Sequence, residues 1–423
     1  MKKLIFVFLL FVIQTPVIAQ ATFQEWYRLS VQAYEAKDYI QFLKAAKEAD
    51  ELRPNHRVLA YNLAAAYALN NEEQKAIETL SKRIAYYAVD DFSKDDDFES
   101  IKSHSSFQQL LEQINEHSRS YRSSKDVFSI TKEGFHPEGL AIDQQNQRIF
   151  LSDIRTGRIY SYDMNGKNEA LELNLKAYGY WSAMGMNFDK NNPSLLWIAT
   201  SAMNVFEGYN SELQGKSAIV SYDISKKKMV HEFTLAGNHT FGDIILDSKG
   251  FIWTTDSSTP AIYKIDPSMQ KMTKEYEFDG WWSLNGLTFS ENERKIYVAD
   301  YITGIFIIDT DEGSIVPLSQ NMESTRGTDG LYRVGSTIIM LQNGTEPMRV
   351  STFDIDDDGN MKRGSWRVRD NNLKDLNEPT LGTVIDRSLY YIASSPWRFY
   401  NGVEQNLEEW PTLNVWKLDI DKD

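Results

Sequence analysis

A unit of short, alternating strands recurs along the chain and constrains its fold more than any other feature. The first copy, FHPEGLAIDQQNQRIFLSDIRTGRIYSYD, runs over 135–163 and contains an opening strand, a turn at 144–147, a strand at 148–153, a Thr-Gly turn and a strand at 158–163. Each strand is too short to be stable alone. The unit therefore needs neighbours of the same kind.

Related copies of this unit return five more times at a spacing typical of propeller blades. Successive copies begin 43 to 58 residues apart. Six units of this size predict a mostly β fold, a six-bladed β-propeller over residues 127–420, in which radial closure leaves only short edges. Residues 127–130 are expected to pair with the last strand, 414–420, and to close the ring. The first residues of the six copies are Glu138, Met184, Gly242, Asn285, Asp329 and Glu378.

Two copies are lengthened by insertions, at 203–216 and 397–411. Both insertions follow the same strand of their unit. We therefore expect them on one face of the disc, where they overhang its centre.

Residues 22–117 carry helical periodicity and no strand signal. Their period of 34 residues resembles the tetratricopeptide repeat, whose Leu, Tyr and Ala positions are matched by Leu63, Tyr67 and Ala76. We predict a small all-α, tetratricopeptide-like domain over 20–117, followed by a polar link at 118–126. The domain is either a peptide-binding groove for a protein partner or a structural cap on the propeller.

The N-terminus predicts a signal peptide over residues 1–19. Two lysines precede an apolar run at 4–13, and the small-residue site Val17-Ile18-Ala19 precedes Gln20. The run is too short to span a membrane, and no later segment approaches a span. The chain has no Cys, which excludes a lipobox anchor, a disulfide and a thiolate metal site. We expect a periplasmic or secreted protein.

The chain is acidic, with a formal net charge of −15. This charge argues against nucleic acid and anionic membranes as partners. It suits the attraction of cations, although solubility alone is the simpler explanation.

The first residues of the six copies are expected to meet near one mouth of the central channel, which the innermost strands line. Four of these six side chains carry oxygen, and three are carboxylates on otherwise apolar strands. Gathering carboxylates in a narrow space costs free energy unless a cation or a shared proton neutralises them. Hard oxygen ligands without His or Cys predict one divalent cation, with Ca²⁺ first and Mg²⁺, Mn²⁺ or Zn²⁺ as alternatives.

Three of these positions carry a family resemblance. Pro137-Glu138-Gly139, Asn285-Gly286-Leu287 and Asp329-Gly330 resemble the metal-binding positions of the SMP-30/gluconolactonase/LRE family of six-bladed propellers. The resemblance covers residues 127–420. It implies that Glu138, Asn285 and Asp329 hold the divalent cation and that Asp329 is also the catalytic base of lactone hydrolysis.

The third blade departs from the family. Many members place an Asn there, where this chain has Gly242-Asp243, so either Asp243 takes over or a water fills one coordination position. Glu378 is an extra carboxylate of the ring and a further metal candidate.

Around the channel mouth we expect a substrate pocket with aromatic walls and a few polar groups. Trp181, His239 and Trp282 each lie three residues before the first residue of their copy, although packing between blades is an alternative role for such aromatic rings. His136 faces the same side of its strand as Glu138 and is expected to support the site from behind. The residues assigned to the pocket are Trp181, His239, Asp243, Trp282, Arg326, Gln342, Asn343 and Trp397.

Other catalytic motifs are absent from the sequence. It contains no G-x-S-x-G, H-E-x-x-H or P-loop, and the loop at 354–359 begins like an EF-hand but has Ser365 where Glu is required. The sequence therefore predicts an exported, metal-dependent hydrolase of the lactonase or esterase type, acting on a small lactone or ester. The alternative is a non-catalytic propeller that binds a ligand or a protein, and a lyase or isomerase on the same metal stays open.

Overall fold

The computed structural model describes residues 22–318, 322–399, 410 and 412–420. The predicted signal peptide, 1–19, lies outside the described residues, as does most of the insertion at 397–411. Within the part of the chain that is described, none of the helices has the length and apolar character needed to cross a bilayer.

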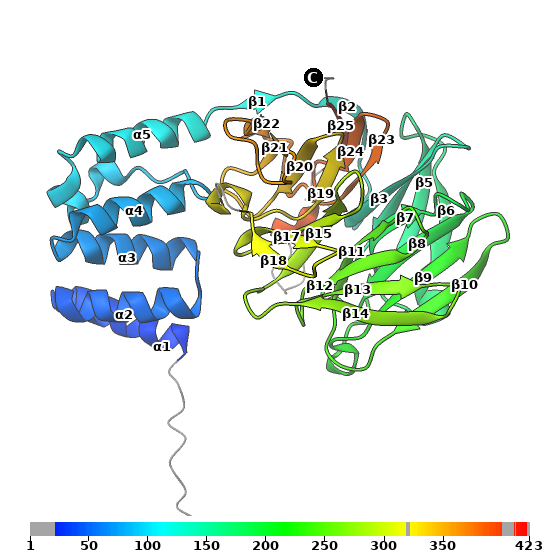
Figure 1. Ribbon diagram of the computed structural model, residues 1–423, viewed down its shortest axis with the longest axis horizontal. Coiled ribbons are helices and arrows are strands. Elements are labelled where there is room, and N and C mark those ends of the chain that lie inside the picture. The colour runs from blue at the N-terminus through cyan, green and yellow to red at the C-terminus, as the bar shows by residue number, and fades with distance from the viewer. Residues whose placement is uncertain (1–21, 319–321, 400–409, 411, 421–423) are drawn as a thin grey trace, which may run out of the picture.

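Six antiparallel sheets arranged around one axis form the larger part of the molecule (Figure 1). The first strand of each repeated unit is innermost and contacts the innermost strands of the two neighbouring sheets. The predicted six-bladed propeller is therefore confirmed. The first three blades are β3 (Pro137–Asp143), β4 (Arg148–Asp153), β5 (Arg158–Asp163) and β6 (Ala170–Asn174); β7 (Ser182–Phe188), β8 (Leu195–Ser201), β9 (Ser217–Asp223) and β10 (Lys228–Thr234); and β11 (Phe241–Leu246), β12 (Ile252–Asp256), β13 (Ala261–Asp266) and β14 (Lys271–Glu277).

The last two blades each include a strand from the segment that precedes the propeller. Strand β1 (Tyr121–Arg122) pairs with β22, and β2 (Lys125–Ile130) pairs with β25. Blades four to six are β15 (Leu284–Phe289), β16 (Lys295–Asp300), β17 (Gly304–Asp309) and β18 (Ile315–Pro317); β19 (Leu331–Val334), β20 (Thr337–Gln342), β21 (Arg349–Asp354) and β22 (Arg367–Asn371); and β23 (Gly382–Ile385), β24 (Ser388–Ile392) and β25 (Leu413–Asp419).

Strand β2 closes the ring in the predicted way. Phe128 lies opposite Val415 and Ile130 opposite Leu413, so the sixth blade combines one strand from before the propeller with three from its end. The link at 118–126 is less irregular than expected, because the backbone of Tyr121 and Arg122 pairs with the edge of blade five. A polar sequence without apolar period gave no sign of this pairing, which uses main-chain groups only.

Apolar side chains between the sheets hold the blades together. Strand β8 is buried along its whole length, and its Trp197 lies in one cluster with Ile244 and Ile252 of the next blade. Because both faces of an inner strand are covered, its sequence is a short apolar run instead of a strict alternation.

The residues before the propeller form a stack of helices. The starts of α1 and α3, at 23 and 57, and those of α2 and α4, at 39 and 73, are both 34 positions apart, which matches the predicted repeat. A cluster of Phe92, Phe98 and Phe107 anchors the last helix against the second pair. The elements are α1 (Phe23–Glu35), α2 (Tyr39–Leu52), α3 (Arg57–Leu69), α4 (Glu73–Ile84), the 3-10 helices η1 (Phe92–Lys94) and η2 (Asp96–Ile101), and α5 (Ser105–His117).

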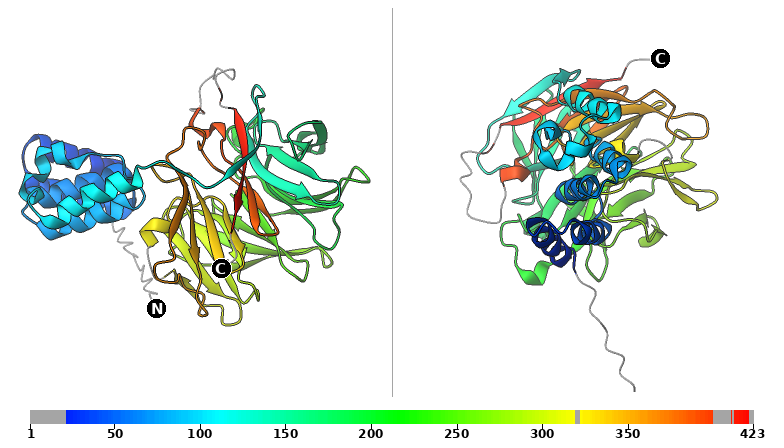
Figure 2. Two further views of the ribbon diagram at one scale, coloured as in Figure 1. Left: turned by 90° about the horizontal axis from the view of Figure 1, so that it is seen from above. Right: turned by 90° about the vertical axis from the view of Figure 1, so that its left-hand side faces the viewer.

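The helical stack is docked on blade five, as Figure 2 shows from two sides. Tyr87 forms a parallel bridge with Glu346. The Nδ2 atom of Asn371 donates hydrogen bonds to the carbonyl oxygens of His117 and Arg119. Arg349, a buried side chain of β21, donates to the carbonyl oxygen of Ala85 over 2.8 Å. In these contacts the stack meets blade five through backbone groups at its helix ends, and the side chain of Asn55 also donates to the carbonyl oxygen of Ile302 in blade four over 2.9 Å.

Candidate functional site

The starting residues of all six repeated units line one cavity at the propeller axis. These are Glu138, Met184, Gly242, Asn285, Asp329 and Glu378, and the cavity has a volume of about 340 Å³. We call this set the axial ring. Met203 and Trp397, which begin the two insertions, also line the cavity. The insertions therefore do start at the central mouth, as their position in the repeat predicted.

A β-bulge displays the ring residue in each of the first four blades. The register of the innermost strand against the second strand shifts at Glu138-Gly139, Met184-Gly185, Gly242-Asp243 and Asn285-Gly286. A bulge places two residues opposite one and bends the strand, which turns a side chain out of the ladder. The bulge thus explains why a residue of an apolar strand points into the channel.

The glycine after the ring residue allows neighbouring blades to approach closely. A Cβ atom on Gly139 would lie 2.2 Å from the carbonyl oxygen of Met184, and one on Gly286 would lie 2.6 Å from that of Asp329. Real side chains do not tolerate such contacts, so the motif of a ring residue followed by Gly is a packing requirement. The channel is narrow because the backbones of neighbouring blades approach each other closely at these glycines.

Hydroxyl groups fix the ring from the side. Ser152 donates to the carbonyl oxygen of Met184 over 2.9 Å, and Thr255 donates to that of Asn285 over 2.6 Å. Thr380 of the last blade donates to the carbonyl oxygen of Glu138 over 3.0 Å. In each pair a hydroxyl group of one blade binds the backbone of the ring residue in the next blade. The bond from Thr380 to Glu138 continues this pattern from the last blade to the first.

Blade three reverses the usual order of residues. A Cβ atom on Gly242 would meet nothing within 4 Å, so the ring position itself is open space. Asp243 stands where four of the other blades have Gly and also lines the cavity. Its Oδ1 accepts a hydrogen bond from the backbone N–H of Ile244, while its buried Oδ2 has no hydrogen-bond partner among the described residues. Burial raises the pKa of Asp243 to about 7.

Asp329 is held by two amide side chains. Asn343 Nδ2 donates to its Oδ2 over 2.7 Å, and Asn285 Nδ2 donates to its Oδ1 over 3.3 Å. Burial raises its pKa to about 6, and the two amide hydrogen bonds oppose that rise. Tyr301 completes the chain by donating from its hydroxyl to Asn343 Oδ1 over 3.0 Å.

Glu138 is the most deeply buried carboxylate of the ring. Trp397 Nε1 donates to its Oε2 over 2.9 Å. Burial raises the pKa of Glu138 well above its ordinary value, and the neighbouring carboxylates of Asp329, Glu378 and Asp243 raise it further. Several carboxyl groups in one water-poor space therefore destabilise one another's charged forms.

Glu378 contacts a cation of the protein itself. Arg398 Nε lies 3.2 Å from its Oε1. Burial raises the pKa of Glu378 to about 7, and the charge of Arg398 opposes this rise. The residue has φ 59°, a left-handed conformation that is uncommon for Glu and that sets its side chain at the rim of the ring.

The donor set fits a hard divalent cation in its chemistry. Carboxylate and amide oxygens line one cavity, burial raises the pKa values of Glu138 and Asp329, and neighbouring carboxylates raise that of Glu138 further. The Oδ2 of Asp243 has no hydrogen-bond partner among the described residues. As they stand, the described His, Asp and Glu side chains do not gather in a group of three or more that could hold a metal ion. Asn285 and Asn343 present nitrogen to Asp329. Binding of a cation by Asn285 therefore requires its amide to turn, while Asn343 can keep its hydrogen bond to Asp329.

The structure separates the predicted pocket residues into three sets. Asp243, Asn343 and Trp397 line the axial cavity. Trp282 and Arg326 line a second cavity beside it. Trp181, His239 and Gln342 line neither of these two cavities. Gln342 is fully buried and donates to the carbonyl oxygens of Ser324 and Arg326, which gives it a role in the loop of blade five.

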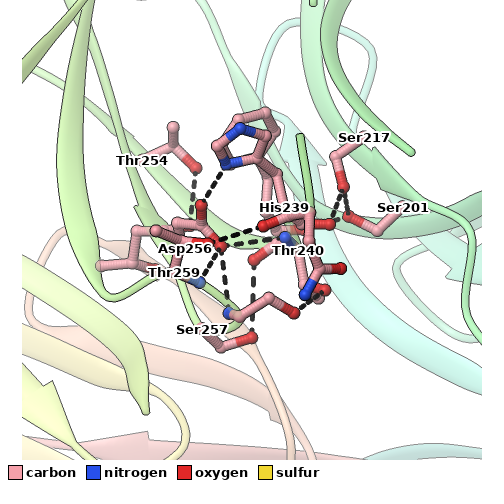
Figure 3. A network of polar contacts seen from close by, with 12 residues as sticks. Ser201, Ser217, His239, Thr240, Thr254, Asp256, Ser257 and Thr259 are labelled. Carbon is pink, nitrogen blue, oxygen red and sulfur yellow. Dashed lines mark hydrogen bonds and ion pairs between the residues drawn. The ribbon is translucent and has the colours of Figure 1, made fainter. Parts of the chain in front are cut away.

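His239 belongs to a turn, as Figure 3 shows. Its Nδ1 lies 2.6 Å from Asp256 Oδ2, and its Nε2 lies 3.2 Å from the carbonyl oxygen of Ala236. Asp256 also accepts backbone N–H bonds from Thr240 and Ser258. Asp153 and Asp300 end the same strand of their blades and accept equivalent backbone bonds. The His239–Asp256 pair is therefore one version of a corner that several blades share. Both ring nitrogens of His239 face groups within this corner, and the residue does not line the axial cavity.

His136 packs behind the ring as expected. Its ring centre lies 4.7 Å from that of Trp397, the residue that donates to Glu138. Burial lowers the pKa of His136 to about 3, so the imidazole is neutral.

Sequence reasoning missed Tyr301 and Ser257 as cavity residues. Both follow the last residue of the second strand of their blade, which is also the position of Asn343. The register of the repeat was therefore the signal that could have found them.

Comparison with known proteins supports the propeller assignment. Residues 136–332 match the family model described as SMP-30/Gluconolactonase/LRE-like region, which includes Glu138, Asn285 and Asp329 and ends before Asn343 and Glu378. No curated protein matches the chain. Among solved structures, the Malassezia sympodialis allergen Mala s 1 is 15% identical with a TM-score of 0.53, covering 70% of this chain and 96% of that one, and shows the fold.

Two further solved structures have lower similarity. The PQQ-bound aldose sugar dehydrogenase of Streptomyces coelicolor is 10% identical with a TM-score of 0.49, and the match covers 71% of this chain and 99% of that one. A luciferin-regenerating enzyme is 13% identical with a TM-score of 0.45, and the match covers 67% and 91%.

Proposed function

Because residues 136–332 of this chain are an SMP-30/gluconolactonase/LRE-like region within a six-bladed propeller, we propose that the protein is a divalent-metal-dependent hydrolase of a small lactone or ester. The observation that carries the proposal is the convergence of Glu138, Asn285 and Asp329 on one axial cavity. Three residues far apart in sequence reach this place because each starts an innermost strand.

Each residue has a role that its surroundings support. Glu138, Asn285 and Asp329 would hold the cation, with Ca²⁺ the first candidate and Glu378 or Asp243 as additional oxygen ligands. When bound, the cation would polarise the carbonyl group of the substrate. Asp329 takes a proton from the attacking water, and the hydrogen bond from Asn343 orients its carboxylate for that step.

The cavity suits a small substrate. Its volume of about 340 Å³ lies at the lower end of the range for small-molecule sites. Met184, Met203 and Leu381 give it an apolar side, while the ring supplies the polar side. A substrate with one polar, hydrolysable group on an otherwise compact body fits this division.

One observation favours a second function. Gly242 leaves the third blade without a ligand at its ring position, so the metal site differs from that of an enzyme with a full set of donors. The alternative is a propeller that binds a ligand without turnover, with the helical stack as a contact for a protein partner. A lyase or isomerase that uses the same site is a variant of the first proposal.

Metal analysis combined with a lactone and ester hydrolysis screen tests the proposal. The wild type should retain about one Ca²⁺ or related cation per chain and should lose hydrolysis on treatment with a chelator. Asp329→Asn should lower hydrolysis at least ~100-fold. The exposed Asp311→Asn, in the turn between β17 and β18 of the neighbouring blade four, serves as the matched control and should keep wild-type activity. A metal-free, inactive wild type would favour the binding alternative.

Export is a part of the proposal that rests on the sequence of residues 1–19. Expression of the whole chain in a bacterial host, followed by N-terminal sequencing of the periplasmic and medium fractions, should find a mature protein that begins at Gln20. A full-length protein confined to the cytoplasm would contradict this part.

A further inference from the structure

A second cavity of about 540 Å³ lies where the helical stack meets the propeller. Its helical walls come from the ends of α2 and α3 and from the segment after α4, and its propeller walls come from loops of blades four to six. We call it the junction chamber. The chamber includes Arg53, Arg57, Tyr86, Trp282, Arg326 and Arg398 among its walls. Neither domain alone contains it.

The junction chamber adjoins the axial cavity and shares part of its wall. Tyr301 and Asn343 line both spaces. The hydroxyl of Tyr301 donates to Asn343, and Asn343 donates to Asp329 over 2.7 Å. A tyrosine and an amide are thus the partition between the chamber and the proposed catalytic carboxylate.

A second link between the two spaces is ionic. Arg398 lies 2.9 Å from Glu346, a chamber residue, and 3.2 Å from Glu378 of the axial ring. The backbone of Glu346 in turn donates to the carbonyl oxygen of Tyr86 and accepts from the N–H of Ala88. The edge of the helical stack therefore connects to the ring through one arginine.

The chamber is cationic on an acidic protein. Four guanidinium groups line it, from Arg53, Arg57, Arg326 and Arg398, against the single carboxylate of Glu346, while the chain as a whole carries −15. Glu346 is already paired with Arg398. Neither Arg53 nor Arg57 lies in an ion pair with any carboxylate in the described ranges. Both exposed side chains lie over aromatic rings, at 4.8 Å from the centre of Phe23 and 5.3 Å from that of Tyr87.

The aromatic contacts hold the side chains of Arg53 and Arg57 in place and leave them accessible to a ligand. An aromatic ring under a guanidinium group fixes its plane while its N–H edge stays open to a ligand. The guanidinium fork matches planar or tetrahedral oxyanions with two parallel hydrogen bonds. Tyr86 and Trp282 add flat apolar walls. The combination is suited to an anionic group attached to a ring.

We propose that the junction chamber is a binding site for a ring-bearing organic oxyanion, such as a carboxylate, sulfate ester or phosphate ester, built jointly by the helical stack and the propeller. The anionic group lies among Arg53, Arg57 and Arg326, and the ring lies against Tyr86 and Trp282. The helical stack is then a wall of a ligand site as well as a cap. The neutral end of the ligand then reaches toward the axial ring. This last step alone rests on the proposed hydrolase function.

Direct binding of inert probes to the full-length mature protein tests the inference without turnover. Benzoate, phenyl sulfate and phenyl phosphate would be titrated by calorimetry and by tryptophan fluorescence, with benzyl alcohol as the neutral probe. At least one anion should bind, benzyl alcohol should bind at least ~10-fold more weakly, and added salt should weaken the anion. The order of the three anions identifies the oxyanion.

Variants on both sides of the chamber locate the site. Arg53→Ala, Arg57→Ala and Arg326→Met should each weaken anion binding about tenfold, and Arg57→Lys should recover part of the loss because it keeps the charge but not the fork. Arg28→Ala is the matched control on an exposed face of α1 and should bind as the wild type does. Circular dichroism verifies that the variants are folded. Wild-type binding by Arg53→Ala and Arg57→Ala, or equal binding of benzyl alcohol, would overturn the inference.

The Asp329→Asn background separates the two proposals. Asp329→Asn should lose hydrolysis and keep anion binding. Anion binding by a wild type that shows no hydrolysis supports the chamber and counts against the proposed function alone. Hydrolysis in a wild type that binds none of the anions has the opposite meaning and overturns the chamber.

Discussion

Asn343 Nδ2 lies 2.7 Å from Oδ2 of Asp329, while Oδ1 of the same asparagine accepts the hydroxyl of Tyr301. This one amide fixes the orientation of the proposed base and separates the axial cavity from the junction chamber. A hydrogen bond to the ionised form of a buried carboxyl group lowers its pKa against the effect of burial. Asn343 therefore lowers the pKa of Asp329 as well as orienting its carboxylate.

Replacing Asn343 should move the pH dependence of hydrolysis. Without a cation, burial raises the pKa of Asp329 to about 6, and a bound cation would lower it; the base works only when deprotonated, so the rate should rise with pH up to this region. Asn343→Ala removes the larger of the two opposing hydrogen bonds, so the acidic limb of the pH–rate profile should shift to higher pH. The rate at pH 6 should fall about 10- to 100-fold. Tyr301→Phe leaves the Asn343–Asp329 bond in place and should keep the limb near that of the wild type; an unchanged limb in Asn343→Ala would contradict the role.

Two glycines at adjacent positions of the repeat, Gly139 after the ring residue of blade one and Gly242 at the ring position of blade three, should respond in opposite ways to a methyl group. A Cβ on Gly139 would meet the Met184 carbonyl oxygen at 2.2 Å, whereas one on Gly242 would meet nothing. Gly139→Ala should therefore lower the free energy of unfolding by about 3 kcal/mol or prevent folding. Gly242→Ala should stay within about 0.5 kcal/mol of the wild type. Thermal unfolding followed by circular dichroism measures the stability of both variants. Similar midpoints would show that neighbouring blades can move apart to accept a methyl group at Gly139.

Asp50 should make the helical stack more stable in mild acid than at neutral pH. Burial raises its pKa to about 6, with Arg326 opposing the rise, and its Oδ1 has no hydrogen-bond partner among the described residues. The folded state then binds a proton that the unfolded chain has already lost between pH 4 and 6, so stability falls as pH rises through this window. Asp50→Asn should flatten this dependence and add about 2 kcal/mol at pH 7.

The measurement is the unfolding midpoint from pH 4 to 8 for the wild type, Asp50→Asn and the exposed control Glu35→Gln. The control should follow the wild type. A pH profile of Asp50→Asn that is parallel to the wild type would assign the dependence to other groups.

Arg349 should be required for docking of the helical stack. This buried side chain donates to Gln342 Oε1 and to the carbonyl oxygens of Ala85 and Ser324, and burial lowers its pKa to about 10, so it stays charged at neutral pH. Arg349→Met removes all three bonds and should cost about 2 kcal/mol. Amide hydrogen exchange of residues 84–90 should become faster, whereas in Arg367→Met, an exposed arginine of the next strand with local bonds only, it should not.

The architecture was predictable because a repeated unit has to satisfy the same geometry several times. Glu138, Asn285 and Asp329 share a register, and a shared register in a closed ring means a shared location, so the sequence was enough to bring them to one cavity. The same logic extends to Ser257, Tyr301 and Asn343, which occupy another common register at the end of the second strand.

The repeat did not predict the contacts that the helical stack and the link make with the propeller. The docking of Tyr87 and Ala88 on Glu346 uses backbone groups, and β1 pairs through its main chain, so neither leaves a side-chain pattern. His239 was placed in the pocket on register alone, but the corner aspartate Asp256 draws its ring into the turn. The junction chamber likewise depends on how two domains meet, which no single repeat describes.

The pairing of β2 with β25 has a consequence for synthesis of the chain. Strand β2 leaves the ribosome before the rest of the propeller, and its partner, Leu413–Asp419, leaves only after the other five blades. Until then the edge of β2 has no partner, and every earlier blade can form around an open ring. A product truncated before Leu413 should therefore keep its first five blades yet expose two strand edges that favour association with other chains. Closure of the ring therefore depends on one pair of strands, and β2 of that pair directly follows the link from the helical stack.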